Sequence, residues 1–327
     1  MEEFLSCDWG TSSFRLRLVE ITGAKIVAEE NSDQGIAKVF DLWKRTGKPE
    51  ELRFSFYVDL VAQCIRSIEQ KLNRSLDKLP LVVSGMACST LGMIDLPYKE
   101  VPFLTDGSDL VIKFAEVSND FKHEIIFISG ARTEGDAMRG EETQLVGCFR
   151  DDQREQLFIF PGTHSKHVIV ENGKVVGIKT FMTGEFFALL SEKSILSASV
   201  ERTMDLSSEK NRNSFEAGVK ESLHSNLLNT SFKVRTNYLF HKLSQQENYH
   251  YLSGVIIGNE MKEATGNDGN IVLVSNSQLQ APYEAAFNVI VNGSRSLKIQ
   301  NADKAIVAGQ LKILNRLLKQ KRCSDVL

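Results

Sequence analysis

Two short segments, one in each half of the chain, share the pattern Gly-Thr-x-Ser. They are Gly10-Thr11-Ser12-Ser13 and Gly162-Thr163-His164-Ser165. Each follows an apolar run typical of a strand and leads into a second such run, which predicts a tight turn between two strands. Turns of this kind present backbone N–H groups and hydroxyls that suit phosphate oxygens. Because the pattern is repeated, we expect two domains of related topology whose turns face a shared cleft.

Composition narrows the class of protein. A chain of 327 residues with 42% apolar and 25% charged residues is typical of a globular protein of two domains. A net charge of -3 argues against a nucleic-acid partner. The apolar runs are too short to span a bilayer and the N-terminus lacks the basic start of a signal peptide, so we expect no membrane association. The five cysteines form no CxxC pair, which favours a reducing cytoplasm over a disulfide or zinc framework.

Apolar periodicity predicts a similar plan in both halves. The first half predicts strands at 14–18, 25–29, 81–83 and 125–128 and helices at 54–72 and 136–147. The second half predicts a hairpin of strands 168–171 and 174–178, helices at 184–194, 251–264, 282–290 and 303–319, and strands at 271–274 and 297–299. The polar segment 201–213 is the expected flexible loop. No low-complexity linker separates the halves, and we place the two domains at 1–148 and 149–327.

Charged side chains lie at both Gly-Thr turns. Asp8 precedes the first turn, where a carboxylate can hold Mg²⁺ beside nucleotide phosphates. The alternative is that Asp8 only caps a turn. Lys166 follows the second turn and can neutralise a phosphate or a carboxylate. His164 and His167 lack a third ligand nearby, so we do not expect a metal between them.

The segment 136–144 holds an arginine, three carboxylates and a glutamine. Phosphoryl transfer to a hydroxyl benefits from a base that takes the proton and a cation that binds an acidic substrate. Successive helical residues point about 100° apart, so Glu141 and Glu142 cannot both face one cleft. The alternative is a solvated helix start, where acids are favoured by the helix dipole.

Two other segments suggest ligand contacts. Residues 84–89 follow a buried strand, and such strand ends commonly build ligand crevices in open α/β sheets, although a simple connecting turn is equally compatible. Gly254 and Gly258 lie in a predicted helix, where glycine costs stability. They allow the close approach either of an adenine ring or of another helix.

Taken together, the motifs closely resemble those of the 2-dehydro-3-deoxygalactonokinase family, within the sugar kinase/actin/Hsp70 superfamily. The matching pieces are Asp8-Trp9-Gly10-Thr11 with Arg15, Ser84-Gly85-Met86 with Ser89, Pro97-Tyr98, Met138-Arg139-Gly140-Glu141-Glu142-Thr143-Gln144-Leu145, Pro161-Gly162-Thr163-His164-Ser165-Lys166, Met182-Thr183-Gly184-Glu185, and Leu252-Ser253-Gly254 with Ile257-Gly258 and Glu260. They occur in family order along nearly the whole chain. The run from Met138 to Gln144 is the specific one, whereas the run from Asp8 to Thr11 alone indicates only the superfamily.

The resemblance implies an α/β fold of two actin-like (ribonuclease H-like) domains of related topology. It implies a cytoplasmic enzyme that uses ATP and Mg²⁺ to phosphorylate a small-molecule sugar acid, 2-dehydro-3-deoxy-D-galactonate, at its 6-hydroxyl in a bacterial galactonate route. Whether the chain forms a homodimer stays open.

The resemblance also implies residue roles. Phosphates are expected at Gly10, Thr11, Ser12, Gly162, Thr163, His164 and Lys166. The sugar acid is expected at Arg15, Ser84, Gly85, Met86, Ser89 and Arg139, with the two arginines suited to its carboxylate. The nucleotide is expected at Gly254, Gly258, Ser275 and Asn276, and Mg²⁺ at Asp8. Glu141 or Glu142 is the expected base, and Asp136 is a third candidate.

This sequence departs from the family pattern at three places. Met93 follows Gly92 where the family tends to have Gly-Trp, Cys88 stands where glycine is usual, and residues 274–277 replace a glycine-containing turn near the nucleotide. These differences leave two alternatives open: a kinase for another 2-keto-3-deoxy sugar acid, or a sugar-acid sensor of the same fold that does not transfer phosphate.

Overall fold

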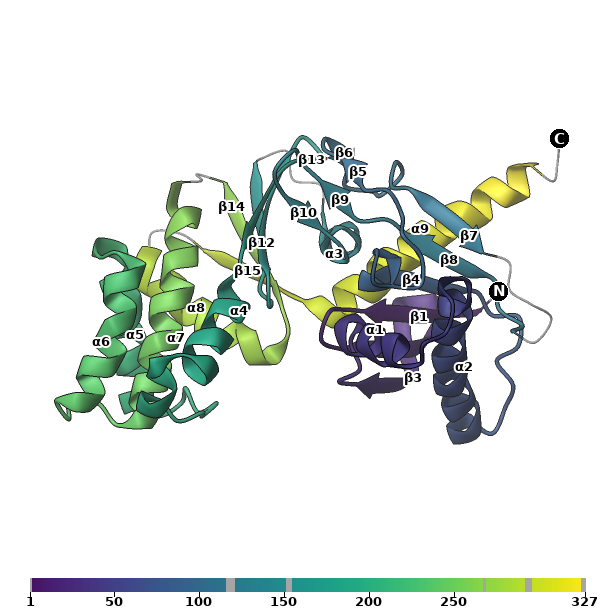
Figure 1. The fold of residues 1–327 in the computed structure, drawn as a ribbon. Coiled ribbons are helices and arrows are strands. Elements are labelled where there is room, and N and C mark those ends of the chain that lie inside the picture. Colours follow the sequence, from purple (N-terminus) through teal and green to yellow (C-terminus); the bar gives the residue numbers. More distant parts are fainter. Residues whose placement is uncertain (1, 116–120, 151–154, 267–268, 292–295, 325–327) are drawn as a thin grey trace. The chain divides into compact units, whose positions relative to one another are not determined.

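The computed structural model describes residues 2–115, 121–150, 155–266, 269–291 and 296–324 (Figure 1). The chain forms two compact units. Unit 1 comprises Met1–Asp152, Gly173–Ile178 and Ala302–Leu327, and unit 2 comprises Gln153–Asn172 and Lys179–Asn301. The boundary expected at 148/149 lies near the first crossing between them. The two units differ from the domains expected at 1–148 and 149–327 because two later segments, one of them the C-terminal helix, belong to unit 1.

A mixed sheet forms the centre of unit 1. Its strand order is β3-β2-β1-β4-β8-β7. The strands are β1 (Glu3–Trp9), β2 (Phe14–Glu20), β3 (Lys25–Ser32), β4 (Leu81–Gly85), β7 (Ile112–Ala115) and β8 (Ile125–Ile128). β1 pairs antiparallel with β2 and parallel with β4. The start of β2 and the end of β4 therefore lie on either side of Asp8. All five residues of β4 and all four of β8 are buried, as their continuous apolar runs predict.

The α-helices in the described part of unit 1 lie between and after its strands in the sequence. They are α1 (Ile36–Arg45), α2 (Arg53–Leu72), α3 (Glu141–Cys148) and α9 (Ala302–Ser324). The predicted helix 54–72 is confirmed, and it ends where Asn73 takes a left-handed φ of 50°. The predicted helix 136–147 is wrong in its first part. Ala137–Met138 form the short strand β10, and Gly140 has a φ of 119°, which a right-handed helix does not allow, so α3 begins only at Glu141.

Short strands complete unit 1. β5 (Lys99–Glu100), β9 (Ala131–Arg132) and β10 form a small sheet in the order β10-β9-β5. β6 (Phe103–Leu104) pairs with Lys174 and Val175, the part of β13 (Lys174–Phe181) that belongs to unit 1.

The strands of unit 2 follow the order β15-β14-β11-β12-β13. They are β11 (Gln156–Phe160), β12 (Ser165–Glu171), β14 (Asn270–Ser275) and β15 (Leu297–Asn301), with the end of β13. The predicted hairpin is confirmed. Asn172 and Gly173 both have positive φ, 50° and 73°, as a two-residue turn of the primed type requires.

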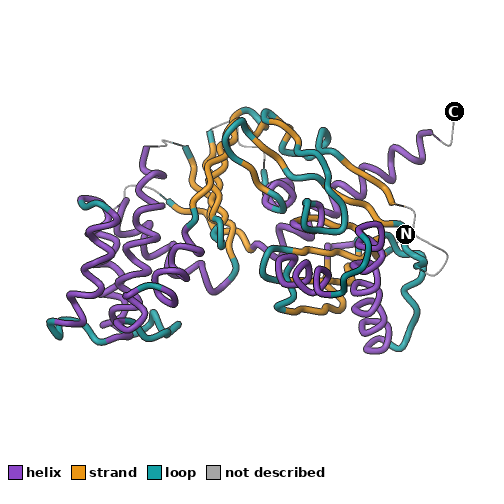
Figure 2. Tube along the Cα trace, in the orientation of Figure 1, coloured by secondary structure: helices purple, strands orange, loops and turns teal. Residues whose placement is uncertain are grey.

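Helices make up most of the rest of unit 2. They are α4 (Thr183–Ala188), the π-helical turn Leu189–Lys193, α5 (Glu209–His224), α6 (Leu227–Leu239), α7 (Gln245–Met261) and α8 (Ser277–Val291). In Figure 2, α5 to α8 form one group beside the strands of this unit. The expected loop 201–213 is wrong over its last five residues, which begin α5, and the helix predicted at 282–290 begins at Ser277 with Pro282 inside it.

Candidate active site

The first Gly-Thr turn is fixed by a helix start. Gly10 N–H donates to Ser13 O at 2.9 Å and closes the turn between β1 and β2. The first N–H group of α1, that of Ile36, donates to Gly10 O at 3.0 Å. A Cβ on Gly35 would lie 2.5 Å from Ser12 Cα, so only glycine lets the helix start approach this closely. α1 was not predicted from the sequence. Its buried Ile36, Val39 and Trp43, spaced by three and four residues, were the available signal.

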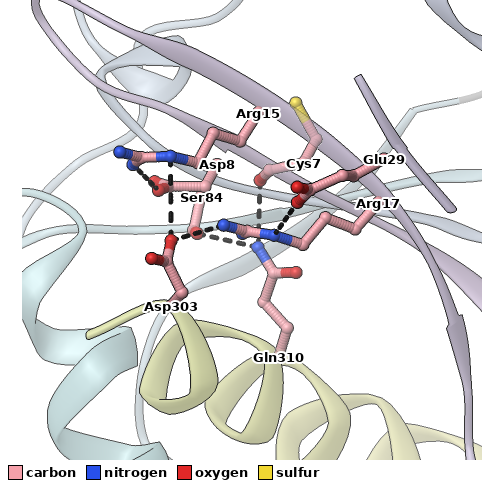
Figure 3. A network of polar contacts seen from close by, with 8 residues as sticks. All are labelled: Cys7, Asp8, Arg15, Arg17, Glu29, Ser84, Asp303 and Gln310. Atoms are coloured by element: carbon pink, nitrogen blue, oxygen red, sulfur yellow. Dashed lines mark hydrogen bonds and ion pairs between the residues drawn. The ribbon is translucent and has the colours of Figure 1, made fainter. Parts of the chain in front are cut away.

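Beside this turn, Asp8 belongs to a network of charges (Figure 3). Arg15 Nη1 lies 3.5 Å from Asp8 Oδ2, and its Nε lies 3.7 Å from Asp303 Oδ1. The buried Arg17 donates to the same Asp303 oxygen at 2.5 Å and pairs with Glu29 at 3.5 Å. Asp303, in the first turn of α9, thus holds both arginines of β2.

The surroundings of Asp8 disfavour its charged form. Burial raises the pKa of this carboxyl, while Arg15 and Arg17 oppose the rise. A Cβ on Gly85 would lie 3.5 Å from Asp8 Oδ1, so the glycine leaves space beside this oxygen. A divalent cation would relieve the cost of a buried carboxylate, and Mg²⁺ is commonly held by one or two carboxylates together with water and phosphate oxygens. Asp8 therefore fits a magnesium ligand. Among the described residues no group of three or more His, Cys, Asp or Glu side chains could hold a metal.

The serines expected to contact substrate are already used inside unit 1. Ser84 Oγ accepts a hydrogen bond from Gln310 Nε2 at 2.9 Å, and the same nitrogen donates to Cys7 O at 2.9 Å. Ser89 Oγ donates to Met86 O at 2.7 Å. Ser84 pairs with Asp8 across the sheet, and Gly85, with a φ of 86°, also lies close to the Asp8 carboxylate.

Arg139 acts as a strut rather than as an exposed cation. It is 8% exposed, and its guanidinium donates to the backbone carbonyls of Cys88 and Leu96. The same group lies 3.9 Å from the centre of the Tyr98 ring. Arg139 therefore fixes the loop after β4, and this arrangement argues against the expected direct contact with the substrate carboxylate.

The three carboxylates of segment 136–144 occupy different environments. Glu142 is fully buried and accepts Gly140 N–H at 2.8 and 2.9 Å and Thr143 Oγ1–H at 3.1 Å. Burial, reinforced by the nearby Glu141, raises its pKa to about 8. Glu141 accepts Arg139 N–H at 3.0 Å and is partly exposed, as is Asp136. Glu142 thus holds the Gly140 turn, while the other two carboxylates are accessible.

Two of the three departures from the family pattern lie in the core rather than at a ligand site. Cys88 and Met93 both lie in the hydrophobic core of unit 1 and are at most 3% exposed. Burial raises the pKa of the Cys88 thiol to about 12. Neither side chain offers a surface to a ligand.

The second Gly-Thr turn has a matching support in unit 2. A Cβ on Gly184, at the start of α4, would lie 2.6 Å from Gly162 O and 2.8 Å from Thr163 Cα. Glu185 N–H donates to Thr163 O at 3.1 Å, and His164 Nε2 lies 2.5 Å from the Glu185 carboxylate. Each Gly-Thr turn therefore packs against a helix start through a glycine.

A cavity of about 370 Å³ adjoins this second turn. Gly162, Thr183 and Gly184 form its border at the turn, and the rest of its wall is mainly apolar and aromatic. The wall includes Phe187, Phe215, Tyr249, Ile256, Ile257, Pro282 and Tyr283. A cavity of this size and lining suits the flat ring and sugar of a nucleoside.

The residues expected at the nucleotide differ in their surroundings. Gly254 and Gly258 face α5, since a Cβ on Gly258 would lie 3.0 Å from Val219 Cα, and this supports the helix-packing alternative. Asn276 caps α8, because its Oδ1 accepts the N–H groups of residues 278 and 279 at 3.1 and 3.2 Å. Ser275 Oγ donates to Asn276 O at 3.0 Å. Lys166, which is expected at the phosphates, donates from Nζ to Thr180 Oγ1 at 3.0 Å.

The fold, together with two solved structures, defines the class of protein. A protein from Sinorhizobium meliloti, described as a candidate 2-dehydro-3-deoxygalactonokinase, matches with a TM-score of 0.74 at 26% identity over 94% of this chain and 96% of its own. The activator of 2-hydroxyisocaproyl-CoA dehydratase from Clostridium difficile, solved with ADPNP, matches with a TM-score of 0.50 at 11% identity over 98% and 97%, which shows the fold alone. The expected α/β fold of the sugar kinase and actin-like ATPase class is confirmed.

Sequence comparison identifies the family. The model of the 2-keto-3-deoxy-galactonokinase family matches residues 8–313. A probable 2-dehydro-3-deoxygalactonokinase of Rhizobium meliloti (strain 1021) is 29% identical over 94% of both chains. The 2-dehydro-3-deoxygalactonokinase of Escherichia coli (strain K12) is 27% identical over 88% of this chain and 90% of its own. The chain belongs to the 2-keto-3-deoxy-galactonokinase family of carbohydrate kinases, as the resemblance predicts.

Proposed function

We propose that this protein transfers the terminal phosphoryl group of ATP to the 6-hydroxyl of 2-dehydro-3-deoxy-D-galactonate, in the breakdown of galactonate in the cytoplasm. Family membership supports the reaction class. The observation that carries the proposal is the Gly-Thr turn packed against a helix start, present once in each unit. Among the described residues no helix is long and apolar enough to cross a membrane.

ATP is proposed to bind unit 2 with its nucleoside in the 370 Å³ cavity and its phosphates at residues 162–164. The N–H groups of this turn and the hydroxyl of the exposed Thr163 suit phosphate oxygens. Gly254, Gly258, Ser275 and Asn276 support the cavity through α5 packing and α8 capping rather than by lining it.

In unit 1, Asp8 is proposed to hold Mg²⁺, and Thr11 and Ser12 to supply N–H and hydroxyl donors to the phosphoryl group. The Gly10 N–H closes the turn that presents them. When bound, Mg²⁺ neutralises charge on the phosphate oxygens. Arg15, whose side chain is 32% exposed, is the proposed contact for the substrate carboxylate. Asp8 and Asp303 hold its guanidinium in place for a two-point contact.

The proton of the 6-hydroxyl is proposed to pass to Glu141 or Asp136, because both are accessible. Glu142 lies fully buried against Gly140, so its proposed role is to hold the turn that precedes α3. E141Q and D136N separate the two candidates: the base variant should lose turnover while it still binds ATP.

An ADP-release assay with Mg-ATP and a panel of sugar acids tests the proposed function. Turnover of 2-dehydro-3-deoxy-D-galactonate, with the phosphate placed on C6 by ³¹P–¹H correlation spectroscopy, is the expected result. Preferred turnover of another acid would overturn the substrate assignment and indicate a sister kinase. Binding of sugar acid without turnover of any of them would contradict the kinase assignment and indicate a sensor.

A further inference from the structure

A buried carboxylate lies at the base of the second Gly-Thr turn. Glu260, in the last turn of α7, is 2% exposed, and each of its oxygens receives two hydrogen bonds. Ser165 Oγ at 2.6 Å and His167 Nε2 at 3.1 Å contact Oε1. Thr183 Oγ1 at 2.5 Å and Tyr283 Oη at 2.6 Å contact Oε2. Four donors from side chains compensate the buried charge, which would otherwise be costly.

The four donors come from the elements that enclose the proposed nucleotide site. Ser165 is the last residue of the Gly-Thr turn and the first of β12. Thr183 begins α4, and both Thr183 and Tyr283 line the cavity. Glu260 therefore joins the turn, the start of α4 and the α8 wall of the cavity through one side chain.

The first residues of α4 also contact the Gly-Thr turn directly. Thr183 is followed by Gly184, which packs against Gly162 and Thr163, and by Glu185, whose N–H donates to Thr163 O. The backbone of the turn is thus held between Ser165 and the first residues of α4. Each of these two supports carries a hydroxyl, that of Ser165 or that of Thr183, which donates to Glu260.

We propose that Glu260 is a positioning residue that sets the geometry of the second Gly-Thr turn against the cavity and thereby governs the phosphate-dependent part of nucleotide affinity. The inference rests on the proposed function, because it takes the turn and the cavity as the ATP site. Glu260 itself does not line the 370 Å³ cavity and acts through the groups that it holds. Its role is to fix the direction of the N–H groups of the second Gly-Thr turn, which would otherwise adopt several orientations.

Replacement of Glu260 by glutamine tests this directly. In E260Q an amide NH₂ replaces one carboxylate oxygen and meets two groups that were donors, so one pair of hydrogen bonds must rearrange. Calorimetric titration with ATP and with adenosine separates the phosphate contribution from the nucleoside contribution. We expect the Kd of ATP to rise at least tenfold and the Kd of adenosine to change less than threefold.

Glu263, one turn further along the chain, provides the matched control. It is exposed and pairs with Lys179 at 2.7 Å, so E263Q removes the same charge without touching the turn. Its affinities for both ligands should equal those of the unaltered protein. If the unaltered protein itself fails to bind ATP, the proposed function is refuted before the variant is considered.

If the unaltered protein binds ATP, two results would overturn the role of Glu260. One is an E260Q protein with unchanged ATP affinity, and the other is an equal loss for ATP and adenosine. Y283F carries the test if E260Q does not fold, because it removes one donor and keeps the charge. A threefold or larger rise in the Kd of ATP alone is expected for Y283F, and no change would contradict the inference.

Discussion

Glu142 makes the stability of unit 1 depend on pH in a way that one substitution removes. Its carboxyl is fully buried, and burial raises its pKa from 4.5 to about 8. Because the folded-state pKa lies above the unfolded one, the folded protein binds the proton more tightly. The stabilisation is complete below pH 4.5 and is lost as the pH rises through 8.

The size of the effect follows from linkage. At about 1.36 kcal/mol per pKa unit, moving from pH 5 to pH 9 removes roughly 4 kcal/mol of stability through this group alone. Glutamine resembles the protonated acid, since it is neutral and its oxygen can still accept Gly140 N–H. E142Q should therefore lack about 4 kcal/mol of this pH dependence.

Urea unfolding followed by tryptophan fluorescence measures the effect. Trp9 and Trp43 are the chain's two tryptophans and both lie in unit 1, so the signal reports the unit that contains Glu142. Stability at pH 5 and pH 9 is compared for the unaltered protein, E142Q and the control E134Q, which alters an exposed acid of the same unit. The reasoning is refuted if E142Q loses as much stability between these pH values as the unaltered protein.

Three further substitutions have expected outcomes. R139K loses the two-carbonyl contact and the stacking on Tyr98, so it should destabilise unit 1 by about 1–3 kcal/mol in the same unfolding assay, and unchanged stability would contradict the strut role. G35A should displace the first turn and lower kcat at least tenfold in the ADP-release assay, whereas the control G135A, whose Cβ meets nothing within 4 Å, should be fully active. D8N should raise the Mg²⁺ concentration needed for half-maximal turnover at least tenfold, and an unaltered Mg²⁺ titration would remove Asp8 as the metal ligand.

Local sequence patterns predicted the parts of the fold that depend on neighbouring residues. β8 is a continuous apolar run, and the hairpin turn is the Asn172-Gly173 pair, whose positive φ values few other residues tolerate. α2 shows its buried face at helical spacing. The helices α5 and α6 were missed because most of their buried residues are polar or glycine, which hides the apolar face. The helix α1 was missed although its buried residues recur at helical spacing.

The site was predictable as a set of residues but not as a set of roles. Arg139 looks like a free cation in the sequence, yet its carbonyl partners at Cys88 and Leu96 lie 51 and 43 residues away. Glu142 looks like a solvated acid at a helix start, yet it is buried. Such partners are brought together only by the tertiary fold, which a single sequence does not display.

The return of α9 to unit 1 has a consequence for how the chain is made. Gln310 bonds to Cys7 O and Ser84 Oγ, and a Cβ on Gly147 would lie 2.7 Å from the backbone nitrogen of Gly309. A ribosome delivers these partners only after all of unit 2. The sheet of unit 1 therefore lacks this helix while unit 2 is being made. A fragment cut after residue 148 would lack this helix for good, whereas a circular permutant that places 302–324 ahead of β1 would supply it at once.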